Sequence, residues 1–213
     1  MKETKGIRSR QEILDQAKQI CNQEGIGVTL SDMAKKMGIT QGKITYHFPT
    51  KDQLFLALVE EFEAKRKQLL LTFKMETEGF DSAFKRMNAS MDLQHDYRCV
   101  HRFLLSNAQY RGEYYSFFKH LANEVRELVS YLIIAFVSAG SLEKRVLQPD
   151  NMNILFFQLA TLFRSWVVTL ELYDQNKSYE EIKPVYLKGI ISCFYLYATE
   201  KGKKELKSVG VPA

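Results

Sequence analysis

Apolar residues recur every three or four positions along most of the chain, which is the periodicity of amphipathic helices. No stretch alternates apolar and polar residues over a length that would favour a β-strand. We therefore predict an all-α fold. Beyond the N-terminal quarter, helices are expected over about 80–95, 97–110, 112–139, 151–174 and 181–201, with disorder only in the first few residues and in the Lys-rich tail.

The N-terminal quarter contains start and stop signals for three short helices. The first ends at a pair of glycines, and Thr29 then has the position of an N-cap for a second helix that stops at Gly38. Thr40 caps a third helix that runs to about His47, where Pro49 prevents continuation. Two short helices joined by a glycine-containing turn form a helix-turn-helix pattern.

The charge composition also changes at the end of the N-terminal quarter, near residue 51. Residues 1–51 carry nine lysines and arginines against five acidic residues, although the net charge of the whole chain is only +5. We predict a helix-turn-helix domain over 1–51, a long linking helix from about 51 to 74, and a larger helical domain over 75–213. The basic excess of the first domain favours a polyanionic partner.

Other classes of protein find little support in the sequence. Three widely spaced cysteines, Cys21, Cys99 and Cys193, argue against a disulfide framework or a zinc finger. The N-terminus lacks the apolar core of a signal peptide, and uninterrupted apolar runs fall short of the ~20 residues of a membrane span. We expect a soluble, cytoplasmic protein.

Enzymatic and metal chemistry are also disfavoured. No G-x-S-x-G, Walker or H-E-x-x-H motif is present, so we expect no enzyme and no cofactor. His95 and Cys99 lie four residues apart, but no further ligand is spaced to complete a tetrahedral site. Packed or hydrogen-bonded histidines are favoured over a metal centre.

The predicted third helix lies in the stretch ITQGKITYHF, whose composition is unusual for a helix. In a helix-turn-helix, the second helix enters the major groove with its N-terminal residues facing the bases. Gly42 then lacks a side chain where protein and DNA approach most closely, and Gln41 and Lys43 reach base edges. Tyr46 and His47 donate to phosphates. The alternative is a solvated helix face whose aromatic residues pack on the domain.

The segment TLSDMAKKMGITQGKITYHFPTKDQL resembles the DNA-binding signature of the TetR family of bacterial transcription regulators, over about Ile13 to Leu58. The matching positions are Thr29, Ala34, Gly38, Ile39, Thr40, Ile44, His47, Phe48 and Lys51. The resemblance implies phosphate contacts by Tyr46, His47 and Lys51. The family commonly has a tyrosine where this chain has Thr45, so whether Thr45 contacts a base or a phosphate stays open. The expected DNA-binding residues are Thr29, Thr40, Gln41, Gly42, Lys43, Thr45, Tyr46, His47 and Lys51.

The resemblance further implies a homodimer on a palindromic operator, with a helical body that dimerises and senses a small molecule. The last two predicted helices are apolar around much of their circumference, which suits a dimer interface; burial inside the monomer is the alternative. We expect a repressor released by an effector, or alternatively an effector-independent architectural or cell-division factor. The expected effector-pocket residues are Arg102, Phe103, Asn107, Gln158, Phe163 and Trp166.

Overall fold

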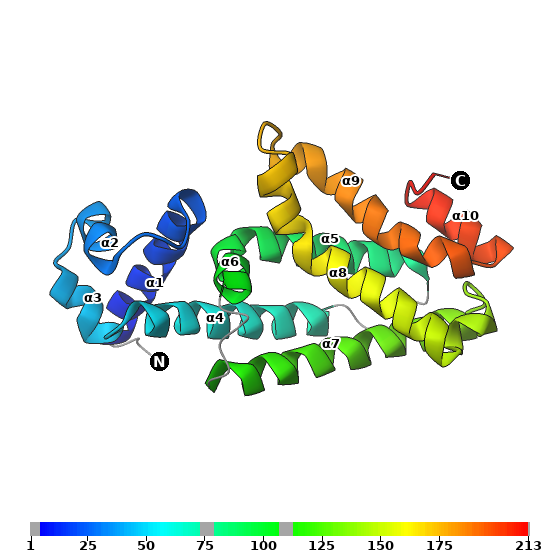
Figure 1. Cartoon of the computed structure of the whole chain (residues 1–213), viewed down its shortest axis with the longest axis horizontal. Coiled ribbons are helices and arrows are strands. Elements are labelled where there is room, and N and C mark those ends of the chain that lie inside the picture. The colour runs from blue at the N-terminus through cyan, green and yellow to red at the C-terminus, as the bar shows by residue number, and fades with distance from the viewer. Residues whose placement is uncertain (1–4, 73–78, 107–112, 213) are drawn as a thin grey trace. The chain divides into compact units, whose positions relative to one another are not determined.

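The computed structural model describes residues 5–72, 79–106 and 113–212 (Figure 1). Within these residues the secondary structure is helical apart from an isolated β-bridge between Leu142 and Ala198, so the predicted all-α fold is confirmed. The helices are α1 (Lys5–Glu24), α2 (Leu30–Met37), α3 (Gln41–His47), α4 (Lys51–Thr72), α5 (Phe80–Asp96), α6 (Arg98–Ser106), α7 (Glu113–Ser138), η1 (Lys144–Leu147), α8 (Pro149–Tyr173), α9 (Tyr179–Ile191), η2 (Ser192–Tyr197) and α10 (Glu200–Ser208), η1 and η2 being short 3-10 helices.

These helices pack as two compact units. The first contains the chain up to Leu69 together with the segment that begins at Asp92 and includes α6. The second contains the first part of α5 and the helices α7 to α10. Packing units do not reveal which residues bind DNA or a ligand, so the functional division into 1–51 and 75–213 stays a prediction.

Side-chain and backbone caps set the ends of the short N-terminal helices. The Thr29 hydroxyl accepts from the backbone N–H of Asp32 at 3.1 Å, and the Thr40 hydroxyl accepts from that of Lys43 at 3.3 Å. Gly38 ends α2 with a φ of 66°, a conformation that glycine adopts without steric cost. The expected caps and the helix-turn-helix are thus confirmed.

Aromatic side chains join α4 to α6 in the core of the first unit. The rings of Phe55 and Phe103 stack with centroids 4.6 Å apart and an interplanar angle of 7°. Phe62 lies 5.6 Å from the Tyr97 ring and 5.2 Å from the His101 ring. Such ring pairs add to the free energy gained by burying their area, so α6 is fixed to the same unit as the helix-turn-helix.

A polar junction fastens the C-terminal end of α1 to the corner between α5 and α6. Lys18 forms an ion pair with Asp96 at 2.7 Å. The Asn22 amide donates to the Asp96 carbonyl at 2.7 Å and accepts from the Cys99 N–H at 2.9 Å. Arg102 donates to two carbonyls at the end of α1, at 3.1 and 3.2 Å. The junction satisfies backbone groups that the helix ends would otherwise leave unpaired.

The three cysteines are free thiols. Burial raises the pKa of Cys21 to about 11 and that of Cys99 to about 12. Cys193 is half-buried, and its pKa is also raised by burial. All three thiols are therefore protonated at neutral pH, and the two buried ones are shielded from solvent as well.

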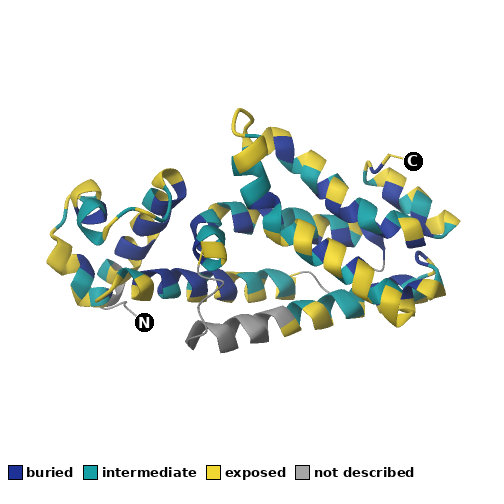
Figure 2. Ribbon diagram, viewed as in Figure 1, coloured by how far each residue is buried: buried dark blue, intermediate teal, exposed yellow. Residues whose placement is uncertain are grey.

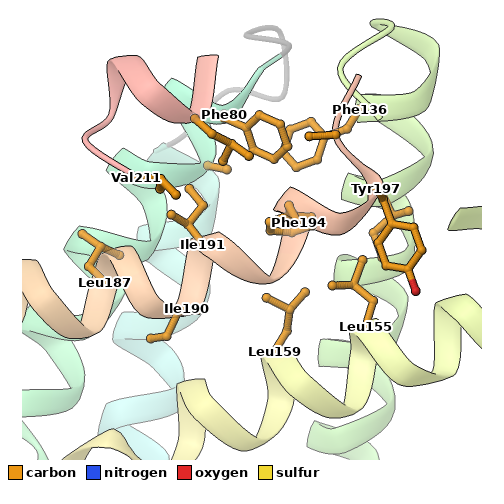
Figure 3. Packing of buried hydrophobic residues seen from close by; sticks show 14 of the residues in the cluster. Phe80, Phe136, Leu155, Leu159, Leu187, Ile190, Ile191, Phe194, Tyr197 and Val211 are labelled. Carbon is orange, nitrogen blue, oxygen red and sulfur yellow. The ribbon is translucent and has the colours of Figure 1, made fainter. Parts of the chain in front are cut away.

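The second unit is built around a cluster of aromatic and aliphatic side chains (Figure 3). Phe80 of α5, Phe136 of α7 and Phe194 of η2 form a triangle whose ring centroids lie 4.8 to 5.6 Å apart. Leu155 and Leu159 of α8 close the cluster from another side. The core therefore joins segments that are more than a hundred residues apart in the chain.

The end of the chain differs from the sequence prediction. The expected single helix over 181–201 is wrong, because α9 gives way to η2 and a turn before α10 begins. The expected disorder of the Lys-rich tail is also wrong. Leu206 and Val211 are buried in the core, and the Glu205 carboxylate accepts from the Ser141 hydroxyl at 3.0 Å. These contacts to distant parts of the chain order a segment whose local composition is strongly polar.

Helix α8 is apolar on two faces. By length and composition alone α8 could cross a membrane, but the core helix of a soluble protein passes the same test. The expectation from sequence did not include α8, because it considered only uninterrupted apolar runs. One face of α8 lies in the core of its unit, while other apolar side chains of the C-terminal helices are exposed (Figure 2). We call the latter the exposed apolar surface: Ile154, Phe157, Leu162 and Leu172 of α8, Val185 of α9 and Leu196 of η2.

Candidate nucleic-acid interface

Two buried side chains orient α3. Ile44 and Phe48 are 0% and 2% exposed, and the Phe48 N–H donates to the Ile44 carbonyl at 2.8 Å. On α2, Met33 and Ala34 are buried as well, and α2 and α3 are in contact. With its inward face held by Ile44 and Phe48, α3 presents its remaining positions outwards.

The outward face of α3 carries polar groups that the protein itself does not use. Gln41 and Lys43 are exposed, and Tyr46 is 83% exposed. Among the described residues, none of these three side chains has a hydrogen bond or an ion pair. An amide, an ammonium and a phenol are therefore available on one short helix for a partner outside the chain.

Gly42 has no intramolecular reason to be a glycine. Its φ is not positive, unlike that of Gly38. A Cβ built on Gly42 would meet only the Thr40 hydroxyl oxygen, at 4.0 Å. Because glycine costs roughly 1 kcal/mol relative to alanine inside a helix, the structure of the free chain would favour alanine here. An external surface that approaches the helix closely would explain the glycine.

The threonines differ in how far their hydroxyl groups are already used. Thr29 and Thr40 are exposed and cap α2 and α3. Thr29 also donates to Asp32, and this hydrogen bond is the main cause that lowers the pKa of that carboxyl. The Thr45 hydroxyl donates to the Gly42 carbonyl at 3.3 Å. Since phosphate oxygens only accept, a phosphate contact by Thr45 would require this bond to break.

The residues around the C-terminal end of α3 have partial partners in the chain. The His47 ring meets the ring of the preceding tyrosine edge-on, with centroids 4.9 Å apart. The Lys51 ammonium donates to the carbonyl of Ile26, which leaves two of its three N–H donors for other acceptors. Arg10 of α1 lies over the ring of the buried Phe48, at 4.8 Å from its centroid. All three side chains belong to the same unit as α3.

The neighbouring lysines of α2 are compensated by acidic side chains. Lys36 pairs with Glu24 at 2.7 Å, and Lys35 lies 4.0 Å from Asp32. Lys43 has no such partner among the described residues. Its positive charge is therefore the one on α3 that a polyanion would meet uncompensated.

Known proteins resemble this chain in the helix-turn-helix and, more distantly, over most of its length. Residues 13–58 match the family described as bacterial regulatory proteins, tetR family. The HTH-type transcriptional regulator AcrR of Shigella flexneri is 24% identical over 196 residues, which cover 87% of this chain and 90% of AcrR. The helix-turn-helix segment over residues 13–58 is thus similar to the DNA-binding part of the TetR family.

Two solved structures share the fold of this chain. A TetR-family transcriptional regulator from Marinobacter aquaeolei VT8 superposes with a TM-score of 0.81 at 16% identity, covering 94% of this chain and 96% of that one. A gamma-butyrolactone receptor described as ArpA-like superposes with a TM-score of 0.72 at 15% identity, covering 97% and 96%. Both matches extend over the C-terminal helices as well as the helix-turn-helix.

The side chains expected in an effector pocket lie partly in the first unit. Arg102 is engaged with the C-terminal carbonyls of α1, and Phe103 is stacked on Phe55. These contacts give both residues a role in holding α6 to the helix-turn-helix unit. A role in binding an effector stays a prediction.

The remaining expected pocket residues lie elsewhere. On α8, Trp166 is buried with its ring 5.7 Å from that of Tyr179, Phe163 packs against the core of the second unit, and Gln158 is exposed. Asn107 lies outside the described residues. The structure thus does not bring the six predicted side chains into one unit, and a shared pocket stays a prediction.

Sequence patterns alone did not single out a buried carboxylate on α4. Glu63 of α4 is only 7% exposed, at a position four residues after the buried Val59. The sequence does contain a signal for this residue: Glu63 falls on the apolar face of the helical pattern, where an aliphatic side chain is expected.

Proposed function

We propose that this chain is a sequence-specific, DNA-binding transcriptional regulator, and that it represses transcription until a small-molecule effector releases it from its operator. The observation that carries the proposal is the outward face of α3. The side chains of Gln41, Lys43 and Tyr46 have no hydrogen bond or ion pair among the described residues, and Gly42 has no reason to be a glycine in the free chain. The match of residues 13–58 to the TetR family points in the same direction.

Each of these groups has a defined role against B-DNA. In the major groove, the Gln41 amide pairs with adenine and the Lys43 ammonium with guanine, and a good base contact discriminates by about 1–3 kcal/mol. Tyr46, His47 and Lys51 donate to phosphates on the rim of the groove and fix the position of α3. Gly42 lets the helix backbone approach the bases.

The regulator acts as a homodimer through the exposed apolar surface on α8, α9 and η2. Large apolar side chains that remain exposed in a monomer mark an interaction surface. A two-fold dimer would place two copies of α3 on half-sites about 34 Å apart, one turn of DNA. DNA binding places the protein in the cytoplasm of a bacterial cell.

Release by an effector follows from a shift between two conformations of the dimer. One conformation binds DNA and the other does not. A compound that binds the second conformation about 10⁴-fold more tightly than the first would shift their equilibrium from 1:99 to 99:1. The gamma-butyrolactone receptor with the same fold is named for a small molecule. The residues proposed to contact the effector are Arg102, Phe103, Asn107, Gln158, Phe163 and Trp166.

The test is selection of binding sites from random duplex DNA with the full-length protein, followed by a screen for compounds that dissociate the complex. The proposal predicts an enriched palindrome and at least one compound class that releases it. Absence of any enriched sequence would overturn the DNA-binding function. Enrichment without release by any compound would support an effector-independent DNA-binding factor instead.

A further inference from the structure

The carboxylate of Glu63 is buried and only half satisfied. Its Oε2 atom accepts from Arg66, with Nε at 2.9 Å and Nη2 at 2.8 Å. Its Oε1 atom is also buried, yet it has no hydrogen-bond partner among the described residues. Both residues lie on α4, and the Glu63 side chain is 9% exposed.

This arrangement is costly unless something else completes it. A buried acceptor without a donor loses its hydration and gains nothing in return, and a charged acceptor loses more than a neutral one. The neighbouring α4 positions Val59 and Phe62 are apolar and buried, so a leucine at position 63 would continue that face without the penalty. Packing of the free chain therefore does not explain the carboxylate.

We propose that Glu63 is the polar anchor of the effector site, and that the effector is an organic molecule presenting an N–H or O–H donor to Oε1. The proposal rests on the ligand-responsive function proposed above and specifies its chemistry. Arg66 holds the carboxylate by one oxygen and leaves the other for the ligand. The rest of such a ligand is apolar, because the anchor is enclosed in a buried part of α4.

The negative charge of the Glu63 carboxylate determines which chemical classes of ligand bind most tightly. A protonated amine donates a charge-assisted hydrogen bond, which is roughly twice as strong as a neutral one. An alcohol or amide donates a weaker bond to the same atom. A carboxylate or phosphate would place a second negative charge against Oε1 and has no donor to offer, so anionic effectors are excluded from this position.

The experiment measures direct binding to the full-length protein by calorimetry, without DNA. The probes are three matched series of aryl-ethyl compounds with one, two or three fused rings: primary amines, alcohols and carboxylates. The variants are Glu63→Gln, which removes the charge, and Glu60→Gln, which removes the same charge from an exposed position of the same helix. Circular dichroism and a melting curve check that each variant folds.

We expect amines to bind the wild-type protein more tightly than alcohols of the same size, and carboxylates not to bind. Glu63→Gln should weaken amine binding by about 10- to 100-fold, the value of a charged hydrogen bond, while Glu60→Gln leaves it unchanged. If Glu63→Gln does not fold, Glu63→Asp keeps the charge but withdraws the oxygens by one methylene, and should weaken amine binding as well.

Three results would overturn the proposal: no amine or alcohol binds the wild-type protein, carboxylates bind best, or the folded Glu63 variants bind amines as the wild type does. Because the measurement contains no DNA, its failure is separate from failure of the proposed regulator. A protein that selects an operator but ignores Glu63 chemistry would retain the regulatory function and lose only this assignment.

Discussion

Replacing Gly42 by alanine separates what α3 needs as a helix from what it needs to contact DNA. In the free chain the added methyl group meets nothing closer than 4.0 Å, and the backbone is not in the left-handed region. The variant should therefore be more stable by about 0.5–1 kcal/mol, the helix-propensity difference between the two residues. For a chain of this size that corresponds to about 1–4 °C in melting temperature.

Binding to the selected operator should change in the opposite direction. The methyl group would occupy the space between α3 and the base edges, and we expect affinity to fall by at least tenfold, about 1.4 kcal/mol. Fluorescence anisotropy with a labelled duplex gives the affinity, and thermal unfolding gives the stability. Gly27→Ala is the matched control, because Gly27 lies in the same unit, has open space for a Cβ and is outside α3.

The combination of the two measurements is what tests the reasoning. A more stable Gly42→Ala protein that binds its operator as tightly as the wild type would refute the close approach at this position. A loss of binding in Gly27→Ala of the same size would also refute it, because the effect would then not be specific to α3.

Three further changes probe other parts of the account. Phe157→Asp on the exposed apolar surface should raise the dimer dissociation constant at least tenfold in sedimentation experiments, since buried aromatic anchors dominate interfaces, whereas Leu71→Asp, at an exposed position of α4, should not. Burial raises the pKa of Glu61, but hydrogen bonds led by that of Tyr97 lower it overall. Tyr97→Phe should therefore reduce the free energy of unfolding by about 1 kcal/mol above pH 5, and the reduction should shrink as acid protonates Glu61. A reduction that does not depend on pH would contradict this expectation. A thiol reagent at neutral pH should modify Cys193 first and reach the two buried cysteines only on unfolding; equal rates for all three would disagree with their burial.

The helix-turn-helix could be predicted from sequence because its determinants are local. Thr29, Gly38 and Thr40 each act on backbone groups within a few residues, so their identities and spacing predict the caps and the turn. The C-terminal helix could not be predicted in this way. Leu206 is ordered by burial against residues from distant helices, and Gly202 allows its backbone to lie directly against the Ser141 carbonyl.

In the candidate site, too, features with local determinants could be predicted from sequence and those that depend on distant contacts could not. The exposure of Gln41 and Lys43 could be predicted, because the helical period and the two apolar residues Ile44 and Phe48 determine which face of α3 points outwards. The guanidinium of Arg102 caps α1, a contact across 80 residues that no local pattern encodes. Glu63 occupies an apolar face in the sequence, but only the structure reveals that Arg66 satisfies one of its oxygens and leaves the other.

The central claim is that α3 binds the major groove in two copies on one face of the DNA. Dimethyl sulfate protection of the selected operator tests it most directly, because the reagent methylates guanine N7, which lies in the major groove. Two protected patches are expected, with centres about 10 base pairs apart and with protection lost in Lys43→Ala. Unprotected guanines throughout a site that the protein binds would contradict it.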